Sequence, residues 1–240
     1  MKFVVLIFKI INTMKTKHTA STLAFFCLSI FFTNAASAQT SSSGSSNKVL
    51  LITSAQVDLL SEEGKAWGFT KDSEEKNRIR ENLKKIIKEA RKQHIPIIHS
   101  PVGFDYELMA GYKPLNTFQK IIIENRLLEI NAPGSKFIPE AFPLENEIVL
   151  PYRQGFSSFW AKSIQEQLKK LRVDTIYIAG MLAEGCVESH VRDAAENGYS
   201  TVVISDAIGS TSLELLDVSM KTLSLHAKAL ISTEEFLKNN

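Results

Sequence analysis

One cysteine, Cys186, stands where a nucleophile would be expected. It ends the segment 180–186, which follows the apolar run 175–179, and a helical pattern continues from it to Asn197. The free N–H groups and the dipole at a helix N-terminus stabilise an anion, so they favour a thiolate and offer donors to a developing oxyanion. A small buried residue that packs a helix on a sheet explains the position alone equally well. Cys186 is therefore a candidate nucleophile.

The first 38 residues have the features of a secretory signal peptide. They contain no Asp or Glu, and a basic stretch precedes an apolar run at 23–32 and a small-residue ending, Ala36-Ser37-Ala38. A membrane anchor is the alternative, but the run is shorter than the about 20 apolar residues that cross a bilayer. We predict a signal peptide over residues 1–38, cleaved after Ala38, and a secreted or periplasmic protein without a membrane partner after cleavage.

Removal of this segment changes the charge and the cysteine count. Its four lysines reduce the 28 basic residues to 24, against 26 acidic residues, so the mature net charge is about −2. This balance offers no polycationic surface, and we exclude a nucleic acid as a partner. The other cysteine, Cys27, leaves with the signal. Cys186 then has no intramolecular disulfide partner, and an unpaired thiol in an oxidising compartment favours either chemistry or deep burial.

The rest of the chain divides into a linker and one domain. Residues 39–47, which are rich in Ser, predict a flexible linker. From residue 48 to 240, short apolar runs alternate with amphipathic segments. The predicted strands lie at 49–53, 95–99, 148–150, 175–179, 201–205 and 229–231, and the predicted helices at 74–93, 158–170, 186–197 and 214–228. This alternation predicts an α/β fold, with three αβα layers around a doubly wound, mainly parallel six-stranded sheet.

The carboxyl ends of parallel strands form the ligand site in sheets of this kind. We therefore expect functional residues after the strands, at 54–58, 99–104, 151–159, 180–186 and 206–211. Aromatic residues gather in segments that flank these ends. Packing in the core or an interface is our first interpretation of them and an aromatic-walled pocket the second; they are Trp67, Phe69, Phe104, Tyr106, Tyr112, Tyr152, Phe156, Phe159 and Trp160.

Three ordered blocks of the chain resemble the isochorismatase-like cysteine hydrolases, a superfamily that includes nicotinamidases, N-carbamoyl amidases and isochorismatases. Residues 49–58 are similar to the family's first strand with its Asp-x-Gln-x-Asp-Phe pattern, and residues 153–159 to its Lys-x-x-x-Ser-Ala-Phe pattern. Residues 180–206 are similar to the segment that carries the family's cysteine. The resemblance covers residues 48–240 and is specific for the fold, whereas it says little about the substrate.

The resemblance also implies a set of catalytic residues. The family uses a Cys nucleophile, an Asp that takes its proton, a Lys that holds both charges, and backbone N–H groups as an oxyanion hole. Carried over by position, the nucleophile is Cys186, and the oxyanion donors are the N–H groups of Leu182 and Cys186. Arg153 takes the place of the lysine and Ser54 that of the aspartate. Arg153 keeps the positive charge but cannot release a proton.

Ser54 is the main departure from the family pattern, because a serine hydroxyl is not a useful base at neutral pH. Three outcomes follow. The thiolate forms without a dedicated base, stabilised by Arg153 and the helix end; another acid or base substitutes; or the pocket is kept for binding without chemistry. The substitutes in the sequence are Asp58, Glu184 and His190. Asp58 matches the family's second acid and more simply caps a loop, Glu184 faces solvent or substrate, and His190 is more simply packed or solvated.

No metal and no cofactor are predicted. The zinc-binding nicotinamidases of the family carry Asp-x-His after the second strand, whereas His99 is followed here by Ser100-Pro101-Val102. No other His occurs between His99 and His190, so the ligand set for zinc is missing.

Two functions remain open on the sequence. The first is a secreted hydrolase that cleaves an amide-type C–N bond of a small-molecule substrate through Cys186, with Arg153 and Ser54 in an atypical triad. The second is a catalytically silent family member that binds a small ligand or a protein partner. Homo-oligomers are common in the family, so the resemblance also allows a homo-oligomer. Residues 104–147 match no motif, and we expect them to shape access to the pocket.

Overall fold

One sheet of six parallel strands organises the domain. The computed structural model describes residues 47–160 and 162–239; the predicted signal peptide and nearly all of the linker lie outside these residues. The strand order is β3-β2-β1-β4-β5-β6, and every neighbouring pair is parallel. The strands are β1 (Lys48–Thr53), β2 (Ile97–Ser100), β3 (Ile148–Val149), β4 (Thr175–Gly180), β5 (Ser200–Ile208) and β6 (Ala229–Ile231). The predicted α/β fold is confirmed, and the sheet is wholly rather than mainly parallel.

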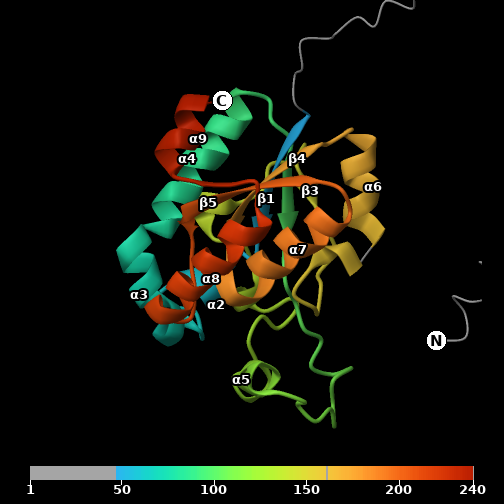
Figure 1. Ribbon diagram of the computed structural model, residues 1–240. Helices are drawn as coiled ribbons and strands as arrows, with labels where there is room; N and C mark the ends of the chain where they lie inside the picture. The colour runs from blue at the N-terminus through green and yellow to red at the C-terminus, as the bar shows by residue number, and fades with distance from the viewer. Residues whose placement is uncertain (1–46, 161, 240) are drawn as a thin grey trace, which may run out of the picture. The chain divides into compact units, whose positions relative to one another are not determined.

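Helices cover both faces of the sheet, which completes the predicted three layers (Figure 1). On one face α4 and α9 pack over the sheet, and on the other α6, α7 and α8 do so. The α-helices are α2 (Val57–Leu60), α3 (Trp67–Asn77), α4 (Ile79–Lys92), α5 (Thr117–Glu124), α6 (Lys162–Lys170), α7 (Glu188–Glu196), α8 (Leu213–His226) and α9 (Thr233–Asn239). Within the described residues, none of the helices is long and apolar enough to span a membrane.

The apolar strands are explained by this double cover. Successive side chains of a strand point to opposite faces of the sheet. In β1, Leu50 and Ile52 enter one apolar cluster, whereas Val49 and Leu51 enter the other. A strand buried on both faces needs apolar residues at every position, which is why the sequence shows continuous runs rather than alternation.

One predicted helix, at 74–93, is wrong as a single element. The chain forms α3 and α4 with a break at Arg78, whose φ of 51° is left-handed. Glu74, predicted to begin the helix, lies near the end of α3, and its carboxylate accepts a hydrogen bond from the Arg80 N–H at 3.1 Å. This carboxylate satisfies a free donor in the first turn of α4, so the break costs little hydrogen bonding. The hydrophobic periodicity of a sequence does not indicate where a single residue adopts a left-handed backbone, so it does not predict this break.

β1 and β4 are neighbours in the sheet, and the order of strand addition switches sides between them: β2 and β3 are added beside β1, whereas β5 and β6 are added beside β4. Ligands of doubly wound sheets bind at such a switch point, beyond the carboxyl ends of the strands. Gly180 ends β4 there with a φ of +119°, and a Cβ at this position would lie 2.0 Å from the Thr53 carbonyl oxygen. Only glycine allows the two strand ends to approach this closely.

Candidate active site

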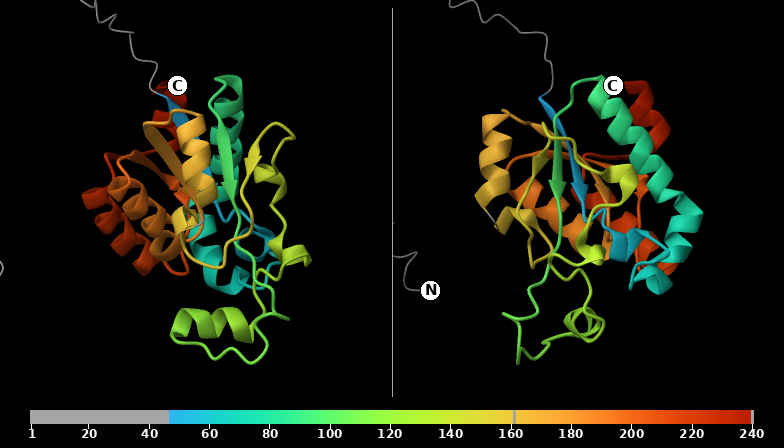
Figure 2. Two further views of the ribbon diagram at one scale, coloured as in Figure 1. Left: turned by 90° about the vertical axis from the view of Figure 1, so that its right-hand side faces the viewer. Right: turned by 180° about the vertical axis from the view of Figure 1, so that it is seen from behind.

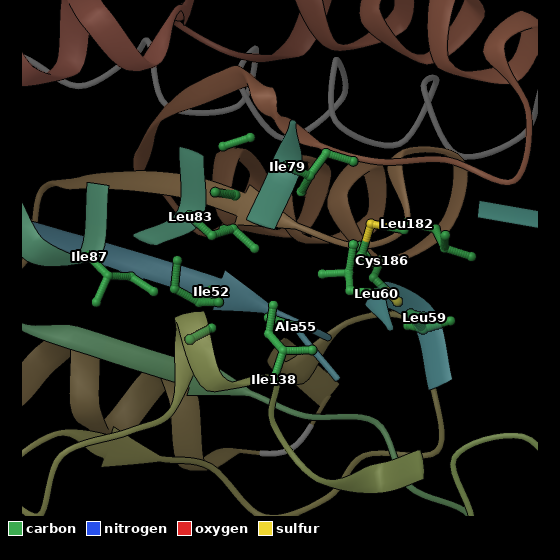
Figure 3. Close-up of a cluster of buried hydrophobic side chains, with 14 of the residues drawn as sticks. Ile52, Ala55, Leu59, Leu60, Ile79, Leu83, Ile87, Ile138, Leu182 and Cys186 are labelled. Carbon is green, nitrogen blue, oxygen red and sulfur yellow. The ribbon is translucent and has the colours of Figure 1, made fainter. Parts of the chain in front are cut away.

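Cys186 lies where β4 leads into α7. A single π-helical turn, Ala183–Val187, runs directly into α7, and the cysteine is the fourth residue of that turn. Its side chain is buried, and Figure 3 shows it beside Leu182 and Leu60 at one end of an apolar cluster. The predicted position at the start of a helix is thus observed, with the first turn widened. Cys186 is both a packed residue and part of a cavity wall.

The loop before the cysteine is held firmly by its backbone. The Met181 N–H donates to the Thr53 carbonyl at 2.8 Å, and the Ala183 N–H donates to the Gly209 carbonyl at 2.7 Å. The Met181–Leu182 peptide between them is cis. Both predicted oxyanion donors, Leu182 and Cys186, line the same cavity. Among the described residues, no acceptor takes the Leu182 N–H.

Arg153 is the buried cation of the site. It follows β3, and its side chain lies among polar groups from three strand ends with only 6% of the residue exposed. Its guanidinium donates to the Thr53 Oγ1 at 2.6 Å, the Ser54 Oγ at 2.8 Å, the Ser100 Oγ at 3.1 Å and the Gly155 carbonyl at 3.3 Å, and the side chain of Cys186 is close enough to raise the pKa of Arg153. The Cys186 sulfur and the position-54 hydroxyl therefore share one cation.

The hydrogen-bond partners of Arg153 are uncharged, which is unusual for a buried arginine. Within residues 47–160 and 162–239, no carboxylate forms an ion pair with it. Burial lowers the pKa of Arg153, and the neighbouring Cys186 acts in the opposite direction. An arginine stays protonated at physiological pH even so. Since a buried charge is costly when it is unpaired, Arg153 favours a negative charge on a group beside it, and the Cys186 side chain is such a neighbour.

Ser54 occupies a constrained position after β1. Its φ of 52° is left-handed, its N–H donates to the Ser100 carbonyl at 3.1 Å, and the residue is fully buried. Left-handed backbone in a residue other than glycine costs roughly 1 kcal/mol, and it concentrates at functional sites. The hydroxyl accepts a hydrogen bond from Arg153. Ser54 thus holds the cation in place, and its chemistry provides no base.

The carboxylate of Asp58 accepts hydrogen bonds from backbone N–H groups. One carboxylate oxygen accepts from the Lys65 N–H at 3.1 Å and the other from the Leu128 N–H at 2.6 Å. A Cβ at position 134 would lie 2.2 Å from this carboxylate, so Gly134 is needed to leave room for it. These bonds tie two distant loops together, in keeping with the loop-capping role considered for this residue.

Glu184 is engaged through one of its two carboxylate oxygens, while its buried Oε2 has no hydrogen-bond partner among the described residues. Its Oε1 accepts from the Thr211 hydroxyl at 2.5 Å and from the Thr211 N–H at 3.0 Å. The bonds fasten the turn that carries Cys186 to the segment that leads into α8.

His190 touches the backbone of the cysteine and not its sulfur. The Ser158 N–H donates to its Nε2 at 3.0 Å, so that nitrogen is the acceptor and Nδ1 carries the proton. Nδ1 donates to the Cys186 carbonyl at 2.6 Å. Complete burial, with a smaller contribution from Arg153, lowers the pKa of His190 to about 3. The imidazole is therefore neutral near pH 7, and its hydrogen bonds join α7 to the 3-10 turn Ser158–Trp160.

A cavity of about 580 Å³ opens onto these residues, with Ser54 and Cys186 in its wall. Residues 104–128, which matched no motif, form much of the opposite wall through α5 and the chain around it. Figures 1 and 2 show α5 set apart from the sheet, beyond the ends to which the strands point. The predicted aromatic cluster divides: Phe69, Phe104, Tyr112 and Phe156 line the cavity, Phe159 is core, and Trp160 is 90% exposed.

Two residues of the site were not singled out from the sequence. Thr53 and Ser100 end β1 and β2, and both bond Arg153. Their positions at the ends of adjacent strands were the available signal. In the described part of the chain, no group of three or more His, Cys, Asp or Glu side chains lies close enough to hold a metal ion.

The parallel sheet with a cysteine and a buried cation at its switch point defines an α/β protein of the cysteine hydrolase class. A family model for the isochorismatase domain matches residues 48–235. The chain belongs to the isochorismatase family, whose hydrolases are generally amidohydrolases.

Three relatives illustrate the range of similarity. Maleamate amidohydrolase of Pseudomonas putida is 32% identical over 32% of this chain and 36% of its own length. Secreted isochorismatase effector Isc1 of Verticillium dahliae is 28% identical over 58% of this chain and 64% of its own length. The crystal structure of N-carbamoylsarcosine amidase from Thermoplasma acidophilum has a TM-score of 0.57 at 18% identity, covering 78% of this chain and 96% of that one. The chain spans between 36% and 64% of the lengths of the curated relatives that it matches.

Proposed function

We propose that the protein is a secreted hydrolase that cleaves the C–N bond of a small amide through a Cys186 thiolate paired with Arg153. The observation that carries the proposal is the buried guanidinium beside Cys186, whose hydrogen-bond partners among the described residues are three hydroxyls and a carbonyl. An adjacent cation activates a thiol by favouring the thiolate. The loop geometry supports the same chemistry, because Leu182 and Cys186 both line the cavity and the Leu182 N–H has no acceptor among the described residues.

The reaction has two steps. The Cys186 sulfur attacks the amide carbonyl carbon, the carbonyl oxygen becomes an oxyanion near the Leu182 N–H, and the C–N bond breaks with uptake of one proton by the nitrogen, which leaves a thioester and an amine or ammonia. Water then attacks the thioester, the C–S bond breaks, and a carboxylate and the thiolate are released with two protons. The net change is the addition of one water to the amide.

The weak point of this chemistry is the proton for the departing nitrogen. Ser54 and Arg153 do not release protons at neutral pH, Asp58 and His190 are hydrogen-bonded elsewhere, and Glu184 is bound to Thr211 through one oxygen. The proton then comes from solvent at the cavity mouth. A positioned acid or base contributes about 10² to 10⁴ in rate, so we expect slow turnover.

Secretion is part of the proposal. It rests on the signal-like residues 1–38, which lie outside the described residues, and on the resemblance to one relative that is named as secreted. An exported enzyme with an unpaired thiol keeps that thiol reduced most easily when it is buried, and Cys186 is buried.

The test is ammonia release from a panel of small primary amides by the purified protein and by Cys186→Ala, with mass spectrometry of protein quenched during turnover. We expect release that the substitution abolishes, and an added acyl mass on the peptide that contains Cys186. Release that persists in Cys186→Ala would overturn the proposal.

The second candidate, a silent ligand-binding member, is favoured by one observation: the position of the family's base holds Ser54. It predicts no acyl adduct in the wild type, with thermal stabilisation by a bound amide that is equal in the wild type and Cys186→Ala.

A further inference from the structure

The wall of the cavity is mainly apolar, apart from the end that Ser54 and Cys186 form. In the part of the chain that the structure describes, no Asp, Glu, Lys, Arg or His lines it. Apolar side chains come from every side, among them Leu59, Phe104, Ile122, Leu128, Phe156 and Leu215. Moving a charged group from water into such surroundings without a partner is strongly unfavourable.

The polar groups of the wall are largely bonded to the protein. Asn116 and Ser212 cap α5 and α8 by accepting from the Gln119 and Leu215 N–H groups. Gln119 in turn accepts from the Leu115 N–H, and the Thr211 hydroxyl donates to Glu184. These bonds complete helix ends and loops, so the oxygens and the hydroxyl that form them offer little to a ligand. The Gln154 side chain and the amide nitrogens of Asn116 and Gln119 have no hydrogen bond among the described residues, and these groups are uncharged.

The cavity is also large for a substrate of a few carbons. At about 30 Å³ for each water in the liquid, 580 Å³ is the volume of roughly 19 waters. Enclosed volumes of this size are typical of pockets that bury most of a drug-sized ligand. A short amide would leave most of the apolar wall in contact with water.

We infer that the substrate is an uncharged, hydrophobic primary amide whose acyl group, aromatic or of about eight carbons, fills this cavity. The inference rests on the proposed hydrolytic function. The amide carbon lies at Cys186, where the cation and the backbone N–H groups are, and the acyl tail extends toward α5 and α8. The tail stays bound through the thioester stage while ammonia leaves.

The experiment compares three amides: acetamide, octanamide, and the monoamide of suberic acid, which has the eight-carbon chain of octanamide with a terminal carboxylate. Burial of each methylene is expected to raise kcat/KM about threefold, so octanamide should exceed acetamide by at least about 100-fold. It should exceed the suberic monoamide by at least about tenfold. A preference for the suberic monoamide, or equal values for acetamide and octanamide, would overturn the inference.

A matched pair of variants on α8 locates the effect. Leu215 lines the cavity and is 42% exposed, whereas Leu225 on the same helix is 81% exposed and away from it. Leu215→Lys introduces a cation beside the acyl tail and should reduce the ratio of octanamide to suberic monoamide at least about tenfold, while Leu225→Lys should leave it unchanged. Equal ratios in the two variants would contradict the placement.

A binding measurement distinguishes a failure of this inference from a failure of the proposed function. If none of the amides is hydrolysed, the function fails, and the inference is tested on Cys186→Ala by thermal unfolding. Greater stabilisation by octanamide than by the suberic monoamide supports an apolar ligand site, and equal or reversed stabilisation overturns it.

Discussion

At the scale of single residues, the site is organised by a cation that has no carboxylate partner among residues 47–160 and 162–239. Arg153 is enclosed by the hydroxyls of Thr53, Ser54 and Ser100, each at the end of a strand. Hydroxyls satisfy the N–H donors of a guanidinium but leave its charge uncompensated. In the proposed reaction this charge is available to the Cys186 thiolate and to the developing oxyanion, while the three hydroxyls beside it transfer protons poorly.

A carboxylate at position 54 should supply the missing proton transfer. The Ser54 Oγ lies 2.8 Å from the Arg153 guanidinium, and Asp tolerates the left-handed backbone found there. We predict that Ser54→Asp raises kcat for amide hydrolysis about tenfold or more. The measurement is the initial rate of ammonia release, with Ser54→Asn as the isosteric uncharged control. A rise of the same size in Ser54→Asn, or a fall in Ser54→Asp, would show that proton transfer does not limit turnover.

Sequence reasoning at this scale found residue types but not their surroundings. The replacement of the family's aspartate by Ser54 and of its lysine by Arg153 can be predicted from the sequence, because both positions lie in blocks with fixed spacing. The engagement of Asp58 with the Lys65 and Leu128 N–H groups is not, since it depends on loops 7 and 70 residues away.

At the scale of elements, α7 is fixed to the rest of the site through His190. The imidazole links the Cys186 carbonyl to the N–H and hydroxyl of Ser158, so the turn that carries the cysteine and the turn before α6 are joined directly. The segment that forms the opposite wall, residues 104–128, has few regular elements apart from α5. Periodicity predicts regular elements, which is why the helices and strands were found and the shape of this wall was not.

The buried His190 should make the fold sensitive to acid. Its pKa is about 3 in the folded protein, mainly because of burial, and about 6.5 when unfolded, so the unfolded state binds the extra proton between these values. Stability is therefore full above about pH 6.5 and falls as the pH drops toward 3, by up to about 1.4 kcal/mol for each pH unit.

Chemical denaturation of the wild type and His190→Gln at several pH values tests this prediction. The difference in free energy of unfolding between the two proteins should shrink by about 2 kcal/mol from pH 6.5 to pH 5. Glu147, with a pKa of about 2, and His99 titrate in both proteins and cancel in the difference. A difference that stays constant over this range would contradict the assigned neutral state.

At the scale of the whole molecule, the topology determines where the site lies. All six strands are parallel, and β1 and β4 are the neighbouring strands at which the order of strand addition switches from one side of the sheet to the other. The residues that follow these two strands therefore meet at the same edge of the sheet. This much is predictable from the alternation of strands and helices. The break of the predicted helix 74–93 at Arg78 is not, because it depends on one left-handed residue.

The predicted signal peptide is a further expectation for the whole chain. Upon expression with an intact export pathway, we predict a mature protein whose first residue is Gln39, detected by N-terminal sequencing and intact mass. Substituting leucine for both Ala36 and Ala38 should block cleavage, because the site requires small residues. A mature protein that begins at Met1 or Met14 would contradict the predicted cleavage.

The pairing of Cys186 with Arg153 is tested most directly by the rate at which iodoacetamide alkylates Cys186 at pH 6.5. We predict that the wild type reacts at least about tenfold faster than Arg153→Met, because an adjacent cation favours the thiolate, and that Arg153→Lys stays within about threefold of the wild type. Thermal unfolding of all three proteins provides the control for folding. Equal rates in the wild type and a folded Arg153→Met would contradict the central claim that this cation activates the nucleophile.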